Sequence, residues 1–281
     1  MTNNCVEYIE KLSQFIEWTM SLKESESFPS FSLHNIFFRG HASKEWHLQA
    51  GIFRNKNINE HDCFKAASNR CWTEVSSFTN LEKLIYFQHF GLLTRLLDVT
   101  SNPLIALYFA CQEYTKNGEY KDGQVRYGSC ERFDIKMVNI IADIVANYDL
   151  EKIYPSENWL QRLAEFYKLK KGDVLGEMLS VPYYIEAPYN SSRITAQRGN
   201  LLMTPLLKKI SSDYILVKEY DFDNANVNNS MFGEKNVVIK HENKKNILDE
   251  LRKVGIDEYS IFPDTSHLMS AINKEMIWTD Y

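Results

Sequence analysis

The segment from Tyr86 to Cys111 sets polar and charged side chains into an otherwise apolar run, and chemistry is expected there first. A charged group among apolar neighbours must find a partner or shift its pKa. Arg95 stays protonated, so Asp98 is its nearest candidate partner in the sequence. The polar members of the segment are Gln88, His89, Thr94, Arg95, Asp98, Thr100, Ser101 and Asn102. So dense a polar set predicts either a structural brace or a binding site.

Two interpretations of Arg95 and Asp98 stay open. As structure, the pair would brace the turn before Pro103, because residues three apart can meet across one helical turn or within a tight loop. As function, Arg95 would hold an anionic ligand while Asp98 fixes its orientation. The Thr-Ser-Asn sequence at positions 100–102 predicts the cap of a helix that starts at Pro103, and a helix N-terminus is also a natural anion site.

A second candidate is the Phe-Arg-Gly-His sequence at positions 38–41, at the end of an apolar strand predicted over 35–39. Glycine permits a close backbone approach or a positive φ. Arg39, with His41 beside it, could clamp a phosphate or a carboxylate in a bidentate manner. In the structural alternative, Arg39 instead pairs with a core carboxylate such as Asp98; a motif this short matches many unrelated chains.

The other reactive side chains fit no established catalytic pattern. Gln88 and His89 fall in a predicted helix with apolar flanks, where a histidine is most often a hydrogen-bonded core residue. Cys111 lies in an apolar run, where a thiol is inert. One further set lacks the spacing of a zinc site, namely His41, His47, His61 and Cys63. The sequence has no Walker A loop, GxGxxG, HExxH or GxSxG motif, and no metal site is predicted.

The composition is that of an ordinary globular protein, with 281 residues, 44% hydrophobic and 25% charged residues. A net charge of -5 gives no global positive field to attract nucleic acid. Five cysteines without a CxxC pair fit a reducing compartment. No N-terminal signal pattern occurs, and no apolar run approaches the roughly 20 residues of a membrane span. We therefore expect a cytoplasmic protein that does not associate with membranes.

The elements that must position the polar residues mix helices and strands. Apolar spacing predicts helices over 4–22, 61–80, 81–90, 134–147, 158–168 and 244–254, besides the one that starts at Pro103. Strands are predicted over 35–39, 180–186, 193–203, 214–217 and 237–239, and residues 259–272 predict strand, turn and helix. This order predicts an α+β fold with a mixed or antiparallel sheet core and flanking helices, rather than a regular βαβ repeat.

Four of these segments together resemble the FRG domain, a family named for its Phe-Arg-Gly motif. They are FFRGH (37–41), QHFGLLTRLLDVTSNPLIALYFA (88–110), RITAQRG (193–199) and IFPD (261–264). The clear resemblance covers roughly Phe37 to Cys111. Leu93 stands where the family usually has proline, and Val99 where it usually has an aromatic residue. Both replacements are apolar, so we expect them to alter turn stiffness and packing more than chemistry.

The resemblance also implies a domain organisation. Residues 1–34 would form a helical lead-in, and residues 35–281 an FRG domain. That domain would carry a helical insertion at about 131–180 and a C-terminal α/β extension.

The order of the motifs is similar to that of ADP-ribosyltransferases. In those enzymes an Arg or His on the first strand contacts NAD, and a Ser/Thr-bearing strand followed by a helix lines the nicotinamide pocket. A late strand supplies a catalytic Glu. The similarity places Arg39 in the first position, Thr100 and Ser101 in the second, and Gln197 near the third.

The neutral side chain of Gln197 departs from that pattern. Cleavage of the nicotinamide–ribose bond passes through an oxocarbenium-like transition state, which a nearby carboxylate stabilises. Gln197 offers only a dipole and hydrogen bonds. Either another carboxylate serves, with Glu186 and Asp98 as candidates, or the fold binds a nucleotide without fast chemistry.

The resemblance thus implies an ADP-ribosyltransferase-like effector in conflict between bacteria and phages, as a toxin or a phage-defence protein, with NAD or a related nucleotide as ligand. The implied catalytic residues are Arg39, Asp98 and Gln197. The implied cofactor-binding residues are Arg39, His41, Gln88, Arg95, Thr100 and Ser101. Arg39 and Arg95 would hold phosphates, and the target would be a protein or a nucleic acid.

Two alternatives stay open. In the first, the chain is a non-catalytic module that binds nucleic acid or protein, and its basic residues contact a phosphate backbone. Those residues are Lys208, Lys209, Lys240, Lys244 and Lys245, although the acidic net charge favours an ordinary solvated surface. The second and weaker alternative is a nuclease, which would need clustered carboxylates for metal ions.

Overall fold

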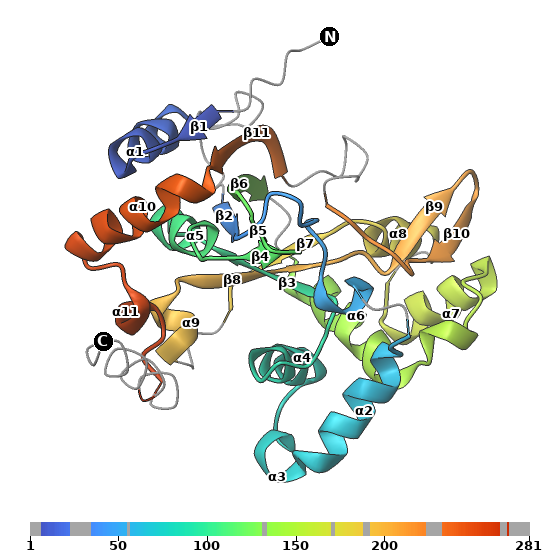
Figure 1. Ribbon diagram of the computed structural model, residues 1–281. Coiled ribbons are helices and arrows are strands. Elements are labelled where there is room, and N and C mark those ends of the chain that lie inside the picture. The colour runs from blue at the N-terminus through green and yellow to red at the C-terminus, as the bar shows by residue number, and fades with distance from the viewer. Residues whose placement is uncertain are drawn as a thin grey trace.

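The computed structural model describes residues 7–22, 35–54, 57–130, 134–169, 172–187, 192–222, 232–264 and 269. It is built on a seven-stranded sheet in the order β1-β11-β6-β2-β3-β8-β7, flanked by helices (Figure 1). Neighbouring strands are antiparallel, except that β1 runs parallel to β11. The predicted fold class, α+β with a mixed sheet and flanking helices, is confirmed.

The strands of the main sheet are β1 (Glu7–Ile9), β2 (Asn35–His41), β3 (Leu96–Thr100), β6 (Gly123–Cys130), β7 (Tyr183–Ile185), β8 (Gly199–Met203) and β11 (Phe232–Ile239). Two small hairpins stand outside it, formed by β4 (Thr115–Lys116) with β5 (Glu119–Tyr120), and by β9 (Leu207–Ile210) with β10 (Asp213–Leu216). The helices are α1 (Leu12–Ser21), α2 (Glu60–Arg70), α3 (Trp72–Val75), α4 (Asn80–His89), α5 (Pro103–Ala110), α6 (Ile135–Asn147), α7 (Glu157–Phe166), α8 (Gly172–Leu179), α9 (Ser192–Ala196), α10 (His241–Lys253) and α11 (Glu258–Ile261). Short 3-10 turns form η1 (Gly51–Arg54) and η2 (Leu150–Lys152).

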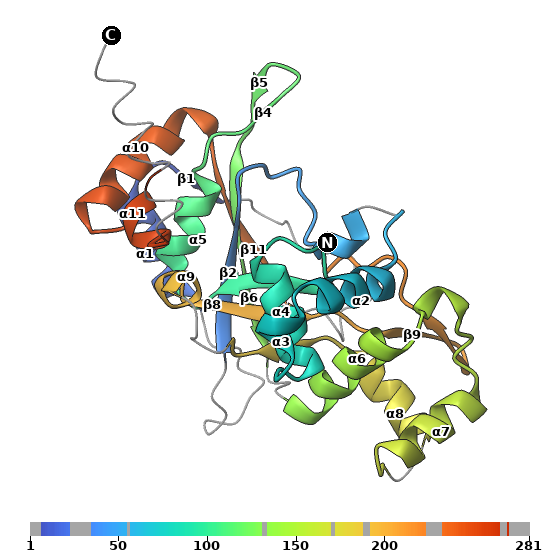
Figure 2. The same cartoon turned by 90° about the horizontal axis from the view of Figure 1, so that it is seen from below.

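The helices form two groups, which pack on the same face of the sheet. Side chains that lie opposite each other in neighbouring strands share a face, and Phe38 lies opposite Thr100. Phe38 belongs to the apolar cluster under α1, α5 and α10, and Leu96, on the face of Thr100, belongs to the cluster under α4, α6 and α8. The right-handed twist of the sheet turns the two groups away from each other (Figure 2).

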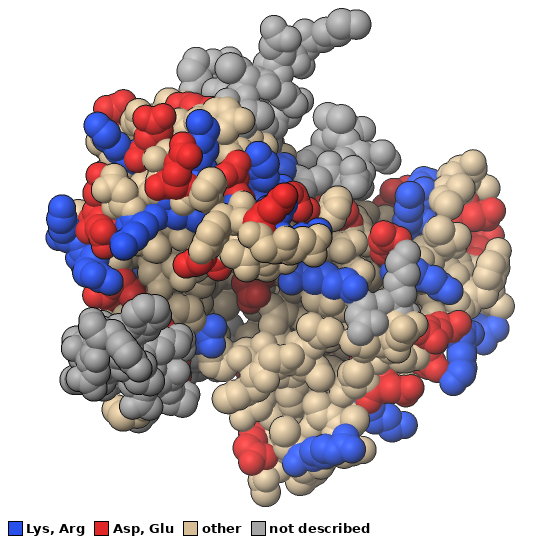
Figure 3. All heavy atoms as spheres, viewed as in Figure 1, with Lys and Arg blue, Asp and Glu red and all other residues tan. Residues whose placement is uncertain are grey.

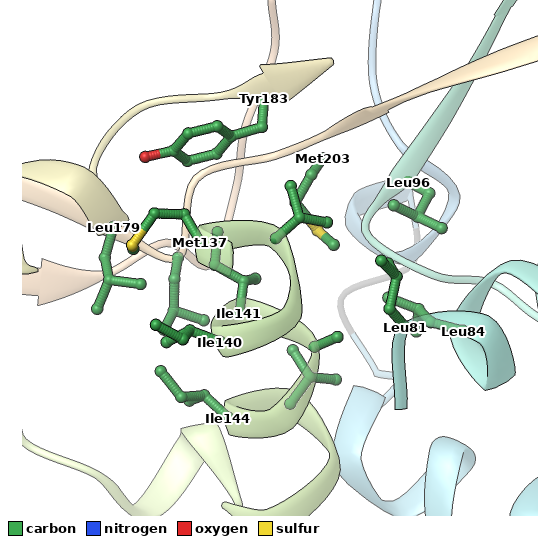
Figure 4. Close-up of a cluster of buried hydrophobic side chains, with 14 of the residues drawn as sticks. Leu81, Leu84, Leu96, Met137, Ile140, Ile141, Ile144, Leu179, Tyr183 and Met203 are labelled. Carbon is green, nitrogen blue, oxygen red and sulfur yellow. The ribbon is translucent and has the colours of Figure 1, made fainter. Parts of the chain in front are cut away.

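Helix α6 forms the centre of the second group. Its buried side chains Met137, Ile140, Ile141 and Ile144 meet Leu179 and Tyr183 on one side and Leu81, Leu84 and Leu96 on the other (Figure 4). Its N-terminus is capped by Asp134, whose carboxylate accepts from the backbone N–H groups of residues 136 and 137. The other face of the sheet carries a third cluster, around Phe37, Leu97 and Tyr184, which η1 and the chain before it cover.

The interior strand β3, which lies between β2 and β8, was not predicted as a strand. Its sequence LLDVT places apolar residues on both faces of the sheet, Leu96 on one and Leu97 and Val99 on the other, so no clean alternation reveals the strand. Between 193 and 203, where one strand was predicted, α9 precedes β8, and Arg198 turns the chain between them with a φ of 47°. Near the N-terminus, pairing with β11 makes residues 7–9 a strand where a longer helix was predicted.

At the C-terminus, the strand predicted at the start of residues 259–272 is instead helix α11, capped by Asp257. Most of the remainder of that prediction lies outside the described residues. The single helix predicted over 61–80 is instead divided at Cys71 into α2 and α3. The other predicted helices and strands occur with shifted ends, and Asn102 is the cap of α5, with its side chain accepting from Leu104 N at 2.9 Å.

Arg95 lies in the core and pairs with Glu60. Its side chain is 2% exposed, and its Nη2 and Nε donate to one Glu60 oxygen at 2.7 and 2.9 Å, while its backbone N–H donates to the other at 2.9 Å. Nη1 also donates to the carbonyl of Pro205 at 3.3 Å. The pair joins the start of α2 to the start of β3. The suggestion from the sequence that Arg95 pairs with Asp98 is therefore wrong.

Gly40 allows α5 to pack closely on the sheet. A Cβ atom at this position would overlap the carbonyl oxygen of Ala106 and lie 2.9 Å from the backbone nitrogen of Ala110. Gly123 on β6 has the same relation to the carbonyl oxygen of Ala110. Two adjacent strands therefore accept the backbone of one helix, and Ala106 and Ala110 are the small residues that allow it.

We expect Gly40→Ala to destabilise the protein by at least about 3 kcal/mol, because backbone atoms on both sides must move to admit the methyl group. Urea unfolding at pH 7 measures the loss. Gly199→Ala is the matched control on another strand of the sheet, since its Cβ would lie 3.6 Å from the nearest atom. Equal losses of unfolding free energy for the two variants would contradict the close packing of α5 on Gly40.

We expect Glu60→Ala to lose about 3–5 kcal/mol of unfolding free energy, because it leaves the Arg95 guanidinium buried without its counter-charge. The double variant Glu60→Met/Arg95→Met removes both charges and should lose less than the single variant. Urea titrations of the three proteins decide between a buried pair and a solvated one. A double variant less stable than Glu60→Ala would refute the assignment.

Candidate functional site

A cavity of about 530 Å³ lies where β2 and β3 separate. Strand β2 pairs with β6 along its whole length but with β3 only at Phe38 and Thr100. The cavity begins beyond this pair and extends between the two helix groups. Figure 3 shows the hollow between the part of the surface that carries α5 and α10 and the part that carries α4.

Arg39 bridges the gap between the two strands. Its Nη1 donates to the backbone carbonyl of Asp98, which faces the gap and has lost its ladder partner. Its Nε donates to Nε2 of His41 at 3.0 Å. Burial lowers the pKa of Arg39 to about 10, with the charge of Asp98 acting in the opposite direction. The guanidinium thus remains charged at neutral pH and has donors left to face the cavity.

Asp98 presents a carboxylate to the cavity from the middle of the sheet. It is the one exposed residue of β3, and its Oδ1 accepts from Gln88 Nε2 at 2.8 Å. The Gln88 amide is fixed in turn, because its Oε1 accepts from the hydroxyl of Thr94. The other carboxylate oxygen of Asp98, Oδ2, has no hydrogen-bond partner among the described residues. An oriented carboxylate of this kind can stabilise a developing positive charge.

His41 is a neutral side chain beside three arginines. Burial lowers its pKa to about 2, and the charges of Arg39, Arg54 and Arg126 add to the shift. Because Nε2 accepts from Arg39, the ring proton lies on Nδ1, beside the backbone of Trp46. The ring is therefore an acceptor that holds Arg39 in place.

Thr100 and Gln197 line the cavity, but their polar groups also hold the backbone. The Thr100 hydroxyl donates to the Gln197 carbonyl at 2.7 Å and accepts from the backbone N–H of Asn102 at 3.0 Å. Gln197 follows α9 rather than lying on a strand, and its Nε2 donates to the carbonyl of Ile261 at 3.4 Å. Its position is therefore not that of a late-strand catalytic residue.

The structure brings six of the eight predicted site residues to one cavity. The six are Arg39, His41, Gln88, Asp98, Thr100 and Gln197. Arg95 lies in the core with Glu60. Ser101 does not line the cavity, and its backbone N–H donates to the Arg198 carbonyl at 3.1 Å. The alternative carboxylate Glu186 is exposed but is not in the lining, whereas its neighbour Ala187 is.

Several lining residues were missed by the sequence reasoning. They are Trp46, Arg54, His89, Glu113, Tyr114 and Arg193. Arg54 donates to the Gln49 carbonyl from Nη2 at 2.8 Å, and Trp46 meets Tyr114 edge-to-face at 4.8 Å. These residues lie in turns or beside element ends, where no periodicity points to a site. Two of them lie in segments that the motifs marked, His89 in 88–110 and Arg193 in 193–199.

The cavity lining carries more positive than negative charge. Arg39, Arg54 and Arg193 face two carboxylates, those of Asp98 and Glu113. An excess of guanidinium groups suits a ligand with phosphate or carboxylate groups. Aromatic rings at one end offer a surface for a planar group. The arrangement can therefore hold an anionic ligand that also has a planar part.

The lysines considered for a nucleic-acid surface do not form one patch. Lys208 and Lys209 lie on β9, and Lys240 and Lys245 lie at the start of α10, on the other side of the molecule (Figure 1). Lys244 is buried, and its ammonium donates to the carbonyls of Ala42 and Gln112 at 2.7 and 2.9 Å. A continuous phosphate-binding surface is thus not formed by this set.

Two further observations concern other classes of protein. Among the residues that the structure describes, no group of three or more His, Cys, Asp or Glu side chains is placed to hold a metal ion. Within the same residues, no helix has the length and apolar character needed to cross a membrane.

We expect His41 to make stability depend on pH between about 6.5 and 2. In that window the unfolded chain binds one proton more than the folded chain, so unfolding free energy falls as pH falls, by up to about 1.4 kcal/mol per pH unit. Urea unfolding of the wild type and His41→Gln at pH 7, 6 and 5 measures the slopes. The variant should show a shallower fall, and parallel slopes would mean that folding does not lower the pKa of His41.

Comparison with known proteins identifies the part of the chain that holds most of this site. Residues 34–119 match the family model of the FRG domain. The match includes β2, α4, β3 and α5, and hence Arg39, Gln88 and Asp98. No curated protein and no solved structure matched the chain. The chain therefore contains an FRG domain.

Proposed function

We propose that the cavity binds a nucleotide, with NAD as the leading candidate, and that the protein is an ADP-ribosyltransferase-like effector. The observation that carries the proposal is the convergence of Arg39, Arg54 and Arg193 on one cavity with Asp98 at its centre. A volume of about 530 Å³ falls in the usual range for small-molecule sites.

The phosphates of the ligand would bind at Arg39 and Arg54. A guanidinium has five N–H donors, and the bonds of Arg39 to His41 and Asp98 leave others for an anion. Arg54 is exposed and bonds only one carbonyl through its side chain among the described residues. The planar parts of the ligand would pack against the Trp46 and Tyr114 rings.

Asp98 would act in place of the glutamate that ADP-ribosyltransferases carry on a late strand, where this chain has the neutral Gln197. Cleavage of the nicotinamide–ribose bond develops positive charge on the ribose, and a fixed carboxylate nearby lowers its energy. Gln88 orients this carboxylate through the bond of 2.8 Å. Gln197 is neutral and Glu186 is not in the lining, so Asp98 is the better candidate for the role.

Arg95 and Ser101 have no part in this proposal, and the Thr100 hydroxyl acts through Gln197 by holding its backbone. The acceptor of the ADP-ribosyl group would be a protein or a nucleic acid. A role in conflict between bacteria and phages, as a toxin or in defence, is supported by the family resemblance alone. A non-catalytic nucleotide-binding module is the alternative if the ligand binds without turnover.

We expect purified protein to bind ADP-ribose in isothermal titration calorimetry and to release nicotinamide from NAD in a chromatographic assay. Asp98→Asn keeps the bond from Gln88 but removes the charge, so nicotinamide release should fall about 100-fold or more while ADP-ribose affinity changes little. Arg54→Gln should weaken ADP-ribose binding about tenfold or more.

Arg162→Gln, on the exposed face of α7, is the control and should behave as the wild type. Arg39 is a poorer test residue, because it also holds the backbone of β3. Binding without nicotinamide release would favour the non-catalytic module. An absence of binding to NAD and ADP-ribose by the folded wild type would end the proposal.

A further inference from the structure

The last residue of α11 and the residue after it contact the cavity wall from outside. Ile261 and Phe262 are not in the cavity lining, yet they touch lining residues from several elements. The Arg193 guanidinium lies 4.8 Å from the centre of the Phe262 ring, and the Phe109 ring meets the same ring edge-to-face at 6.0 Å. The carbonyl of Ile261 accepts from Gln197.

Phe262 therefore ties α5 to α9 across one end of the cavity. Phe109 is on α5 and Arg193 is on α9, and the two helices belong to segments far apart in the sequence. A cation over the face of an aromatic ring is attracted by the negative charge of that face, and more strongly when the cation is partly desolvated. Arg193 is half-buried, so the ring selects one position for a side chain that would otherwise sample many.

The electrostatics of His89 place the same segment near the cavity. Burial lowers the pKa of this lining residue, the charge of Arg193 lowers it further, and the charge of Asp264 raises it. Arg193 and Asp264 thus both act on a side chain of α4. The charge of Asp264, in the segment after α11, therefore acts on α4, a third wall of the cavity.

We propose that Phe262 is a positioning residue that holds Arg193 toward the cavity and so sets its affinity for anionic ligands. The choice of a nucleotide as the anion rests on the proposed function; the positioning of Arg193 does not. Because coupling is reciprocal, an anion that binds Arg193 also stabilises the docked position of the segment around Phe262.

The first test needs no ligand. Phenylglyoxal modifies accessible guanidinium groups, and mass spectrometry follows the rate at Arg193 in the wild type, Phe262→Leu and Phe262→Trp. Leucine keeps an apolar side chain but has no ring to hold the cation, so the rate should rise about threefold or more. Tryptophan restores a ring and should return the rate to near the wild-type value.

Phe166→Leu is the matched control, since Phe166 is an exposed aromatic residue of α7 outside the cavity. It should leave the modification rate of Arg193 unchanged. Thermal unfolding checks that each variant is folded. Equal Arg193 rates in the folded Phe262→Leu variant and the wild type would overturn the proposal.

The second test uses ADP-ribose as the probe in calorimetry. Phe262→Leu should weaken its binding about three- to tenfold, and Phe262→Trp should restore it. If the wild type binds no ADP-ribose, the nucleotide proposal fails, and the modification rates still decide the role of Phe262. If ADP-ribose binds equally to wild type and Phe262→Leu, Arg193 does not contact the anion and the positioning proposal is overturned.

Discussion

The separation of β2 from β3 after a single residue pair is the constraint on which the cavity depends. Each strand is fixed by a different part of the molecule. Strand β2 is held by β6 and by α5, which rests on Gly40, whereas β3 is held by β8 and by the Arg95–Glu60 pair at its start. Arg39 joins the two strands where they diverge, by donating to the exposed carbonyl of Asp98. The FRG motif is thus one structural unit, in which Phe38 packs, Arg39 bridges and Gly40 admits the helix.

The helices reinforce this division. Both helix groups lie on one face of the sheet, and the twist separates them above β3, so the cavity has a polar floor between two apolar walls. A polar floor buried in this way needs oriented partners. The hydrogen bonds from Thr94 through Gln88 to Asp98, and from Arg39 to His41, supply them. Because His41 is neutral, it accepts a hydrogen bond from Arg39 without adding to the positive charge of the arginines.

The sequence was sufficient for the fold class and for much of the site, because both depend on local patterns. Helix periodicity, the Asn102 cap and the polar density around Asp98 are local, and so is the Phe-Arg-Gly motif. The partner of Arg95 is not local, since Glu60 lies in another helix. Had β3 been recognised as a strand, alternation would have placed Arg95 and Asp98 on opposite faces and excluded their pairing. Arg54 and Trp46 reach the cavity only through the path of an irregular segment, which no spacing rule describes.

The place of β1 in the sheet has a consequence for the order in which the fold is completed. This edge strand pairs with β11, which comes from near the other end of the described chain, and β11 is also the outer neighbour of β6. During synthesis the first strand emerges from the ribosome long before its partner exists. The apolar face of α1 and the edge of β6 therefore stay exposed until β11 and α10 have been synthesised. Closure of this half of the sheet is therefore a late event in folding, whereas α4, β3 and α5 can meet early.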